Sequence, residues 1–383
     1  MRFSFPDLVL VDREHALVNR LADEEEWACE GGLPPVGRRK ASVCGAGCCK
    51  DGPFSLSSAE HLRTPAMNRR QFLAFSAALL SRAETHSLCS AAEGAGPLDL
   101  IDCHTHFYDP TRREGVPWPG KGTSLYRRVL PEDLRALPKF RPVTGTVIVE
   151  ASPWLEDNQW LLELAREDPF VVGVVGSLQP GQPGFGVAAK RFAGAPLFRG
   201  IRISSKLLGT LLETGELADL RLLAELDRAL DVNGGPEVLA LAARVGALVP
   251  ELRVVVNHIG NVEVSAAEPP RVWQEGVRLA AAQKNVFCKV SALVEGASRG
   301  GRKAPVDPGF YIPYIDVVWD AFGAERVIYG SNWPVCESAA DYATVQRISL
   351  EHASSRGDTA LRGFCSLNAK RAYKWVERPG RLG

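Results

Sequence analysis

Short apolar runs alternate with helical patterns along residues 97–377. The apolar runs are typical of strands, and the stretches between them repeat apolar residues at the spacing of an amphipathic helix. We predict strands at 98–103, 146–151, 171–178, 199–204, 230–233, 253–258, 286–291 and 327–331. The predicted helices include 156–168, 216–229, 235–248, 271–284 and 311–323.

Strands that alternate with helices pair in parallel. About eight such units in fewer than roughly 300 residues match the size of a (β/α)8 barrel. An open doubly wound sheet is the alternative, but no glycine-rich dinucleotide turn follows any of the strands. We therefore predict an α/β fold of the (β/α)8 TIM barrel type over 97–377, with catalytic residues at the C-terminal strand ends.

The residues before the barrel follow a different pattern. Residues 1–66 mix charge runs with Gly, Pro and Cys and show little periodicity, so we interpret them as a mis-called or disordered extension. A genuine N-terminal domain is the alternative. Residues 67–92 place Arg69-Arg70 before a short apolar run and then small residues, which resembles a cleaved twin-arginine export signal. That signal predicts a periplasmic or extracellular location, or a cytoplasmic one if it is not used.

Composition narrows the class of partner. The chain has 383 residues, is 45% hydrophobic, and balances 45 basic with 45 acidic residues. Zero net charge argues against a nucleic-acid partner, and no apolar run is long enough to span a bilayer. We expect a small-molecule substrate, and the sequence leaves the oligomeric state open.

Histidines gather at the predicted strand ends. The predicted barrel contains His104, His106, His258 and His352, and the first three follow or end a strand. Because side chains alternate along a strand, His104 and His106 point to one face, where two neutral imidazoles can hold a metal or polarise a substrate. The alternative for His258 is a hydrogen-bonded structural imidazole.

Other strand ends carry charged or amide side chains: Glu150, Arg202, Lys289 and Asn332. The planar fork of Arg202 suits a carboxylate or a polarised carbonyl, and its alternative role is an ion pair with Glu150. Lys289 is costly to bury without a partner, which favours a role in the site, with Glu150 as its counter-ion or as a base.

Several segments resemble one known family. "IDCHTHFYD", "GIRI", "VVVNHIGN", "NVFCKVSA", "FGAERVIYGSNWPV" and "NAKRAY" are similar to the amidohydrolase-related barrels. The branch that they resemble contains L-fuconolactonase and 2-pyrone-4,6-dicarboxylate lactonase. The resemblance covers about residues 97–377 and implies a barrel hydrolase in which a carboxylate on strand eight activates water.

The resemblance also implies roles for single residues. His104 and His106 match the first-strand pair of the family, His258 matches its strand-six histidine, and Arg202 matches an arginine near substrate carboxyl or lactone oxygens. Two positions depart from the family. Asn332 stands where the family usually has Asp, and Asp231 or Asn233 stands where metal-binding relatives have a histidine on strand five.

We therefore predict a hydrolase that opens a lactone of a sugar acid or dicarboxylate-type substrate with activated water. The predicted catalytic residues are His104, His106, His258 and Asn332, and the predicted substrate-binding residues are Arg202, Lys289 and Glu150. The base is His258 or Glu150, since an amide cannot take a proton from water.

The sequence is compatible both with a bound metal cofactor and with catalysis without metal. His104, His106 and His258 could hold one divalent metal such as Zn²⁺ with an open position, and the lactonase branch also includes members that work without metal. Two alternative functions follow from the same residues: a metal-dependent decarboxylase-like lyase, or a degenerate barrel that binds a sugar acid without turnover, which Asn332 favours.

Overall fold

The computed structural model describes residues 97–299 and 302–380. The predictions for residues 1–66 and 67–92 therefore lie outside the described residues. Eight parallel strands pair in the order β1 to β8, as the alternating pattern predicted. Their bounds are β1 Ile101–Thr105, β2 Gly145–Val149, β3 Val171–Gly176, β4 Phe198–Ser204, β5 Ala229–Asn233, β6 Val254–Val256, β7 Val286–Val290 and β8 Val327–Tyr329.

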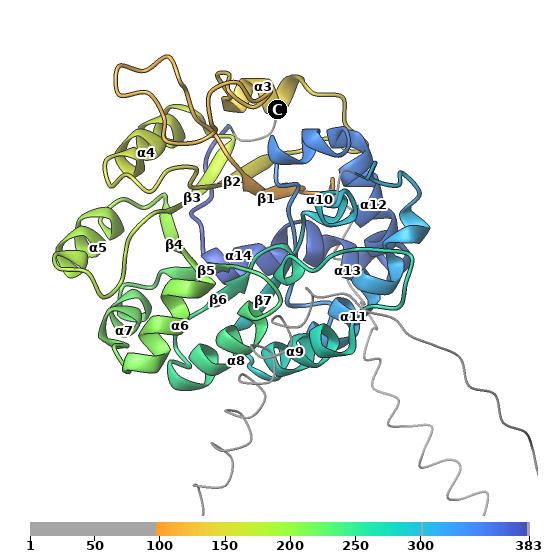
Figure 1. The fold of residues 1–383 in the computed structure, drawn as a ribbon. Coiled ribbons are helices and arrows are strands. Elements are labelled where there is room, and N and C mark those ends of the chain that lie inside the picture. The colour runs from red at the N-terminus through yellow and green to blue at the C-terminus, as the bar shows by residue number, and fades with distance from the viewer. Residues whose placement is uncertain (1–96, 300–301, 381–383) are drawn as a thin grey trace, which may run out of the picture. The chain divides into compact units, whose positions relative to one another are not determined.

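Helices connect the strands and follow one another around the outside of the strand ring (Figure 1). Their bounds are α3 Pro131–Ala136, α4 Asp157–Glu167, α5 Phe185–Ala193, α6 Ser205–Thr214, α7 Ala218–Glu225, α8 Val238–Leu248, α9 Arg271–Ala282, α10 Leu293–Ala297, α11 Ile312–Phe322, α12 Tyr342–Ser355, α13 Asp358–Arg362 and α14 Asn368–Tyr373. Local sequence sets several ends. The Ser204 side chain accepts a hydrogen bond from the Leu207 amide and caps α6, which stops at the left-handed Gly215.

The first and last strands meet and close the ring at its C-terminal edge. Thr105 pairs in parallel with Trp333, just beyond β8. The His106 amide donates to the Trp333 carbonyl at 2.8 Å, and the Asn332 amide donates to the His104 carbonyl at 2.9 Å. These contacts confirm the predicted (β/α)8 barrel, nearly closed, and they bring "HTH" at the end of β1 beside "SNW" just after β8.

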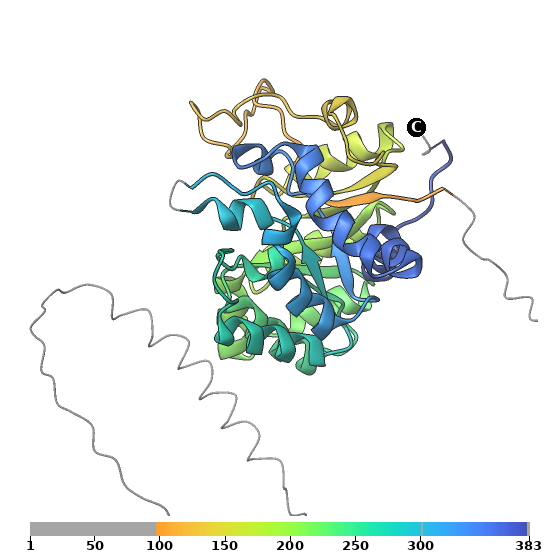
Figure 2. The ribbon, with the colours of Figure 1, turned by 90° about the vertical axis from the view of Figure 1, so that its right-hand side faces the viewer.

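The apolar core has two layers separated by the strands. Outward residues such as Ile148 and Val232 pack against the helices. Inward residues such as Val149 and Val255 form a second cluster with Tyr373 and its neighbours on α14. Figure 2 shows α14 at the end of the barrel opposite the loop 107–130. The helix therefore closes the N-terminal end and leaves the C-terminal end for a site.

Three strand ends differ from the predicted ones in a way that matters for the site. β1 continues to Thr105, so His104 lies within the strand, next to a register shift between Asp102 and Thr105. β6 and β8 end early, and His258 and Asn332 lie in the following turns with φ of 58° and 63°.

Among the described residues, no helix combines the length and apolar character needed to cross a bilayer.

Candidate active site

A cavity of about 340 Å³ opens at the C-terminal ends of the strands. This volume is near the lower end of the range for pockets that hold small molecules. Its polar lining comes from β4, from β5 and from the segments that follow β1, β6, β7 and β8, and comprises His106, Arg202, Asn233, His258, Asn261, Glu295 and Asn332. Four residues predicted from the sequence thus line one cavity, whereas His104, Lys289 and Glu150 lie beside or below it.

The three predicted imidazoles come together as the barrel geometry requires. The ring centroid of His104 lies 5.0 Å from that of His106 and 4.2 Å from that of His258. Burial lowers the pKa of all three, and that of His106 falls to about 3. The rings are therefore neutral near pH 7 and act through hydrogen bonds rather than charge.

Backbone carbonyls fix the tautomer of His106. Its Nδ1 lies 3.0 Å from the Val149 carbonyl oxygen and 3.2 Å from that of Glu150. A carbonyl oxygen only accepts, so Nδ1 carries the hydrogen and Nε2 presents a lone pair. This lone pair faces Oδ1 of Asn332 at 3.3 Å.

Lys289 fixes the opposite tautomer of His104. Its side chain is fully buried, and Nζ lies 2.6 Å from Asp231 Oδ2 and 3.3 Å from His104 Nδ1. An ammonium only donates, so Nδ1 of His104 accepts and its hydrogen is on Nε2. That Nε2 is buried without a partner in the described part of the chain, and a polar atom placed between the imidazoles would satisfy it.

The Asp231 carboxylate is held by further donors. Tyr373 of α14 donates to Oδ1 at 2.8 Å, and the amide of Asn257 donates to Oδ2 at 2.8 Å. Lys289 is therefore part of a buried layer under the cavity, and we assign it a positioning role in place of the substrate contact predicted from the sequence.

Arg202 and Glu150 form the ion pair that was the alternative reading of the sequence. Arg202 Nε donates to Glu150 Oε1 at 2.8 Å, and Nη2 donates to the Glu150 carbonyl at 2.9 Å. Burial raises the pKa of Glu150, and the charge of Arg202 opposes that effect. Because two bonds leave the rest of the guanidinium fork for a ligand, Arg202 supplies a positive charge to the cavity, and Glu150 orients it.

Sequence reasoning missed Glu295, which lies on the short helix α10 after β7 and lines the cavity. Its Oε1 accepts a hydrogen bond from Asn332 Nδ2 at 2.8 Å, and its Oε2 is buried without a partner among the described residues. Burial raises the pKa of Glu295 to about 7. The available signal was a single carboxylate inside the otherwise apolar "SALVEGA", a few residues beyond a strand end.

Five residues around the mouth adopt the left-handed conformation that side chains usually avoid. They follow β6, β7 and β8, and comprise His258, Ile259, Asn261, Ala292 and Asn332. Ala292 precedes α10 with φ of 54°, and this turn leads the chain from β7 to Glu295. Backbone strain of this kind concentrates at functional sites.

The three histidines do not fit the metal site that the sequence allowed. Since Lys289 donates to Nδ1 of His104, the remaining nitrogen of that ring carries a hydrogen and has no lone pair for a cation. Only His106 and His258 can then offer nitrogen lone pairs. Within 97–299 and 302–380, no group of three or more His, Cys, Asp or Glu side chains is arranged to hold a metal ion.

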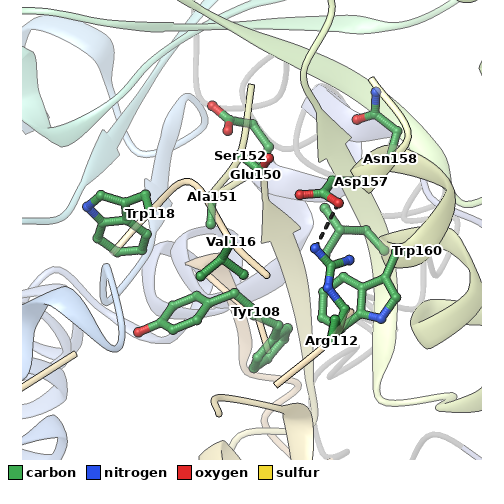
Figure 3. A pocket seen from close by; sticks show the side chains of 12 residues that line it. Tyr108, Arg112, Val116, Trp118, Glu150, Ala151, Ser152, Asp157, Asn158 and Trp160 are labelled. Carbon is green, nitrogen blue, oxygen red and sulfur yellow. Dashed lines mark hydrogen bonds and ion pairs between the residues drawn. The ribbon is translucent and has the colours of Figure 1, made fainter. Parts of the chain in front are cut away.

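A second, smaller pocket beside the cavity shows how the loop after β1 is held (Figure 3). Arg112 forms an ion pair with Asp157 at 2.8 Å, and its guanidinium lies 4.5 Å from the centre of the Trp160 ring. Trp118 belongs to both pockets and its ring centroid lies 5.9 Å from that of His106. Arg112 therefore connects the loop after β1 to α4, and Trp118 forms part of the wall of the cavity.

The chain belongs to the amidohydrolase family: the Amidohydro_2 model, described as amidohydrolase, matches residues 101–375. An L-fucono-1,5-lactonase of Burkholderia ambifaria is 31% identical over 248 residues, covering 63% of this chain and 82% of the relative. One of Burkholderia multivorans is 30% identical over 276 residues, covering 68% and 91%.

Solved structures agree with these relatives. The crystal structure of an amidohydrolase from Burkholderia multivorans with bound zinc is 27% identical, with a TM-score of 0.64, and covers 73% of this chain and all of that one. The predicted family and fold are thereby confirmed, and with them the prediction of a hydrolase.

Proposed function

We propose that the cavity binds a lactone of a sugar acid or dicarboxylate and opens it with water. The observation that carries this proposal is that Arg202, His106, His258 and Glu295 line the same small cavity. The Arg202 cation suits the electron-rich oxygens of a lactone, and the named relatives act on L-fucono-1,5-lactone.

The charge and the protonation state of each side chain indicate its role in the proposed reaction. Arg202 stabilises the negative charge that develops on the carbonyl oxygen during attack, which is usually the largest catalytic contribution. Nε2 of His104 is a hydrogen-bond donor, because the contact with Lys289 fixes that tautomer. Neither of the two bases predicted from the sequence is well placed, because Glu150 is tied to Arg202 and the pKa of buried His258 is well below its usual value.

We propose that these residues work without a resident metal, because the His104 tautomer removes one of three nitrogen ligands. The test is hydrolysis of L-fucono-1,5-lactone, D-glucono-1,5-lactone and 2-pyrone-4,6-dicarboxylate by the purified protein, with elemental analysis, before and after exhaustive chelation. We expect hydrolysis of at least one lactone, at an equal rate after chelation.

Other outcomes separate the alternatives. Activity that disappears with the metal and returns with Zn²⁺ would contradict metal-independent hydrolysis, and release of CO₂ would indicate a lyase. Saturable binding of these compounds without turnover would indicate the non-catalytic barrel.

A further inference from the structure

The reaction needs a group that takes a proton from water, and Asn332 cannot do so. Among the residues that line the cavity, Glu295 is the carboxylate. Its Oε1 is held by Asn332, and its buried Oε2 has no partner in the described chain. A carboxylate that lines the cavity, with one oxygen held by an amide and the other without a hydrogen-bond partner among the described residues, has the hydrogen-bonding capacity that a general base needs.

We propose that Glu295 is the catalytic base that activates water for attack on the lactone carbonyl, an assignment that rests on the proposed lactone hydrolysis. The carboxylate takes a proton from water as the water oxygen bonds to the carbonyl carbon. When the ring C–O bond breaks, the Glu295 carboxyl returns that proton to the departing alkoxide oxygen. The product is the open hydroxy acid, and Glu295 is again ionised.

The hydrogen bonds of the Asn332 side chain depend on whether Glu295 is protonated. When Glu295 is ionised, Asn332 Nδ2 donates to it, and Oδ1 then faces the lone pair of His106 at 3.3 Å, an unfavourable contact between two acceptors. When Glu295 is protonated, the amide can turn over, accept from the carboxyl and donate to His106. The bond that Asn332 donates lowers the pKa of Glu295, and burial raises it by more. Relief of the contact between Asn332 and His106 is a separate effect that favours the protonated carboxyl.

Of the titratable groups named here around Glu295, we expect only Glu295 to change its protonation near neutral pH. Tyr311 and Cys336 lie close, and burial followed by the charge of Glu295 raises the pKa of both, so they are neutral. His106 and His258 line the same cavity and have lowered pKa values. Since the pKa of Glu295 is about 7, its ionised form appears as pH rises through that value.

The test compares kcat, KM and the pH profile of kcat/KM for the wild-type protein, Glu295→Gln and Glu275→Gln, with the lactone of the panel above that the wild-type protein opens fastest. The matched control Glu275 is exposed on α9, away from the cavity lining. We expect the wild-type profile to rise with an apparent pKa near 7. Glu295→Gln should lower kcat by about 100-fold or more, remove that rise and leave KM within about threefold, and Glu275→Gln should match the wild type.

Folding of the variant is checked by thermal unfolding. The folded protein holds the Glu295 proton to a higher pH than the unfolded chain, so this group reduces stability as pH rises from about 4.5 to about 7. Glu295→Gln should therefore unfold at the same or a higher temperature than the wild type at pH 8.

Two results would overturn the assignment while the proposed function stands. These are an active wild-type protein whose Glu295→Gln variant keeps kcat within twofold, or a slow variant that still shows the rise near pH 7. A wild-type protein that opens none of the lactones would overturn the proposed function, and the assignment with it.

Discussion

Lys289 illustrates how a single buried charge controls chemistry that it does not perform. Its ammonium lies between Asp231 and His104, and all three side chains are inaccessible to solvent. Burying a charge is tolerable only with a partner, and the paired charges then fix their neighbours strongly. Here the neighbour is an imidazole whose tautomer decides whether it donates a hydrogen bond or binds a cation.

Replacement Lys289→Met should destabilise the fold by about 3–5 kcal/mol, because it leaves the Asp231 carboxylate buried without its cation. Denaturant unfolding of Lys289→Met, Asp231→Asn and the double variant measures this effect. The double variant should be more stable than Lys289→Met, since both charges are then removed. A double variant as unstable as the sum of the single ones would contradict a coupled pair.

At the scale of elements, the seam between β1 and β8 positions the site. Gly330 follows β8, and a Cβ added there would lie 2.8 Å from Cβ of His104 and 3.5 Å from that of Ser291. Ser291 lies 2.9 Å from Nδ1 of His258. The absence of a side chain at Gly330 therefore allows the two strands to approach where the imidazoles meet.

Gly330→Ala should lower kcat of the proposed lactone hydrolysis and destabilise the fold by about 1–3 kcal/mol, because the added methyl group overpacks the seam against backbone-attached atoms that cannot turn aside. Gly209→Ala is the matched control. Gly209 lies within α6, where an added Cβ has its nearest neighbour at 4.0 Å, so this change should preserve activity and stabilise the helix by up to about 1 kcal/mol. Equal kcat values for Gly330→Ala and the wild type would show that the approach is not needed.

At the scale of the whole molecule, one end of the barrel is closed by a helix and the other end holds the cavity. α14 closes the N-terminal end, where Arg199 and Arg253 donate to carbonyls of Tyr373 and Ala372 at 2.8 and 2.6 Å. The cavity at the other end is bounded by the turns after the strands. All residues that line this cavity come from the barrel itself.

We propose that the native protein is exported through its twin-arginine segment and cleaved before Glu93. Peptide sequencing of the N-terminus of the protein from a periplasmic fraction should then begin at Glu93, and Arg69→Lys/Arg70→Lys should leave the protein in the cytoplasm. A native peptide from residues 1–66 would show that the extension is part of the protein.

The sequence by itself determined the order of elements and predicted four of the residues that line the cavity. Apolar runs at strand length, separated by helical patterns, permit few topologies, and the parallel barrel places every strand end at one mouth. For that reason His104, His106, His258, Arg202 and Asn332 could be assigned to one end of the barrel from the strand ends alone.

The tertiary structure decided what pattern cannot encode, namely which polar atoms meet. The depth of Lys289, the tautomers of His104 and His106, and the pairing of Arg202 with Glu150 depend on contacts between residues far apart in the chain. Glu295 lines the cavity from the short helix α10, which follows the left-handed Ala292, and its raised pKa follows from burial. Burial and partner geometry are properties of the closed barrel, so only the folded chain could reveal them.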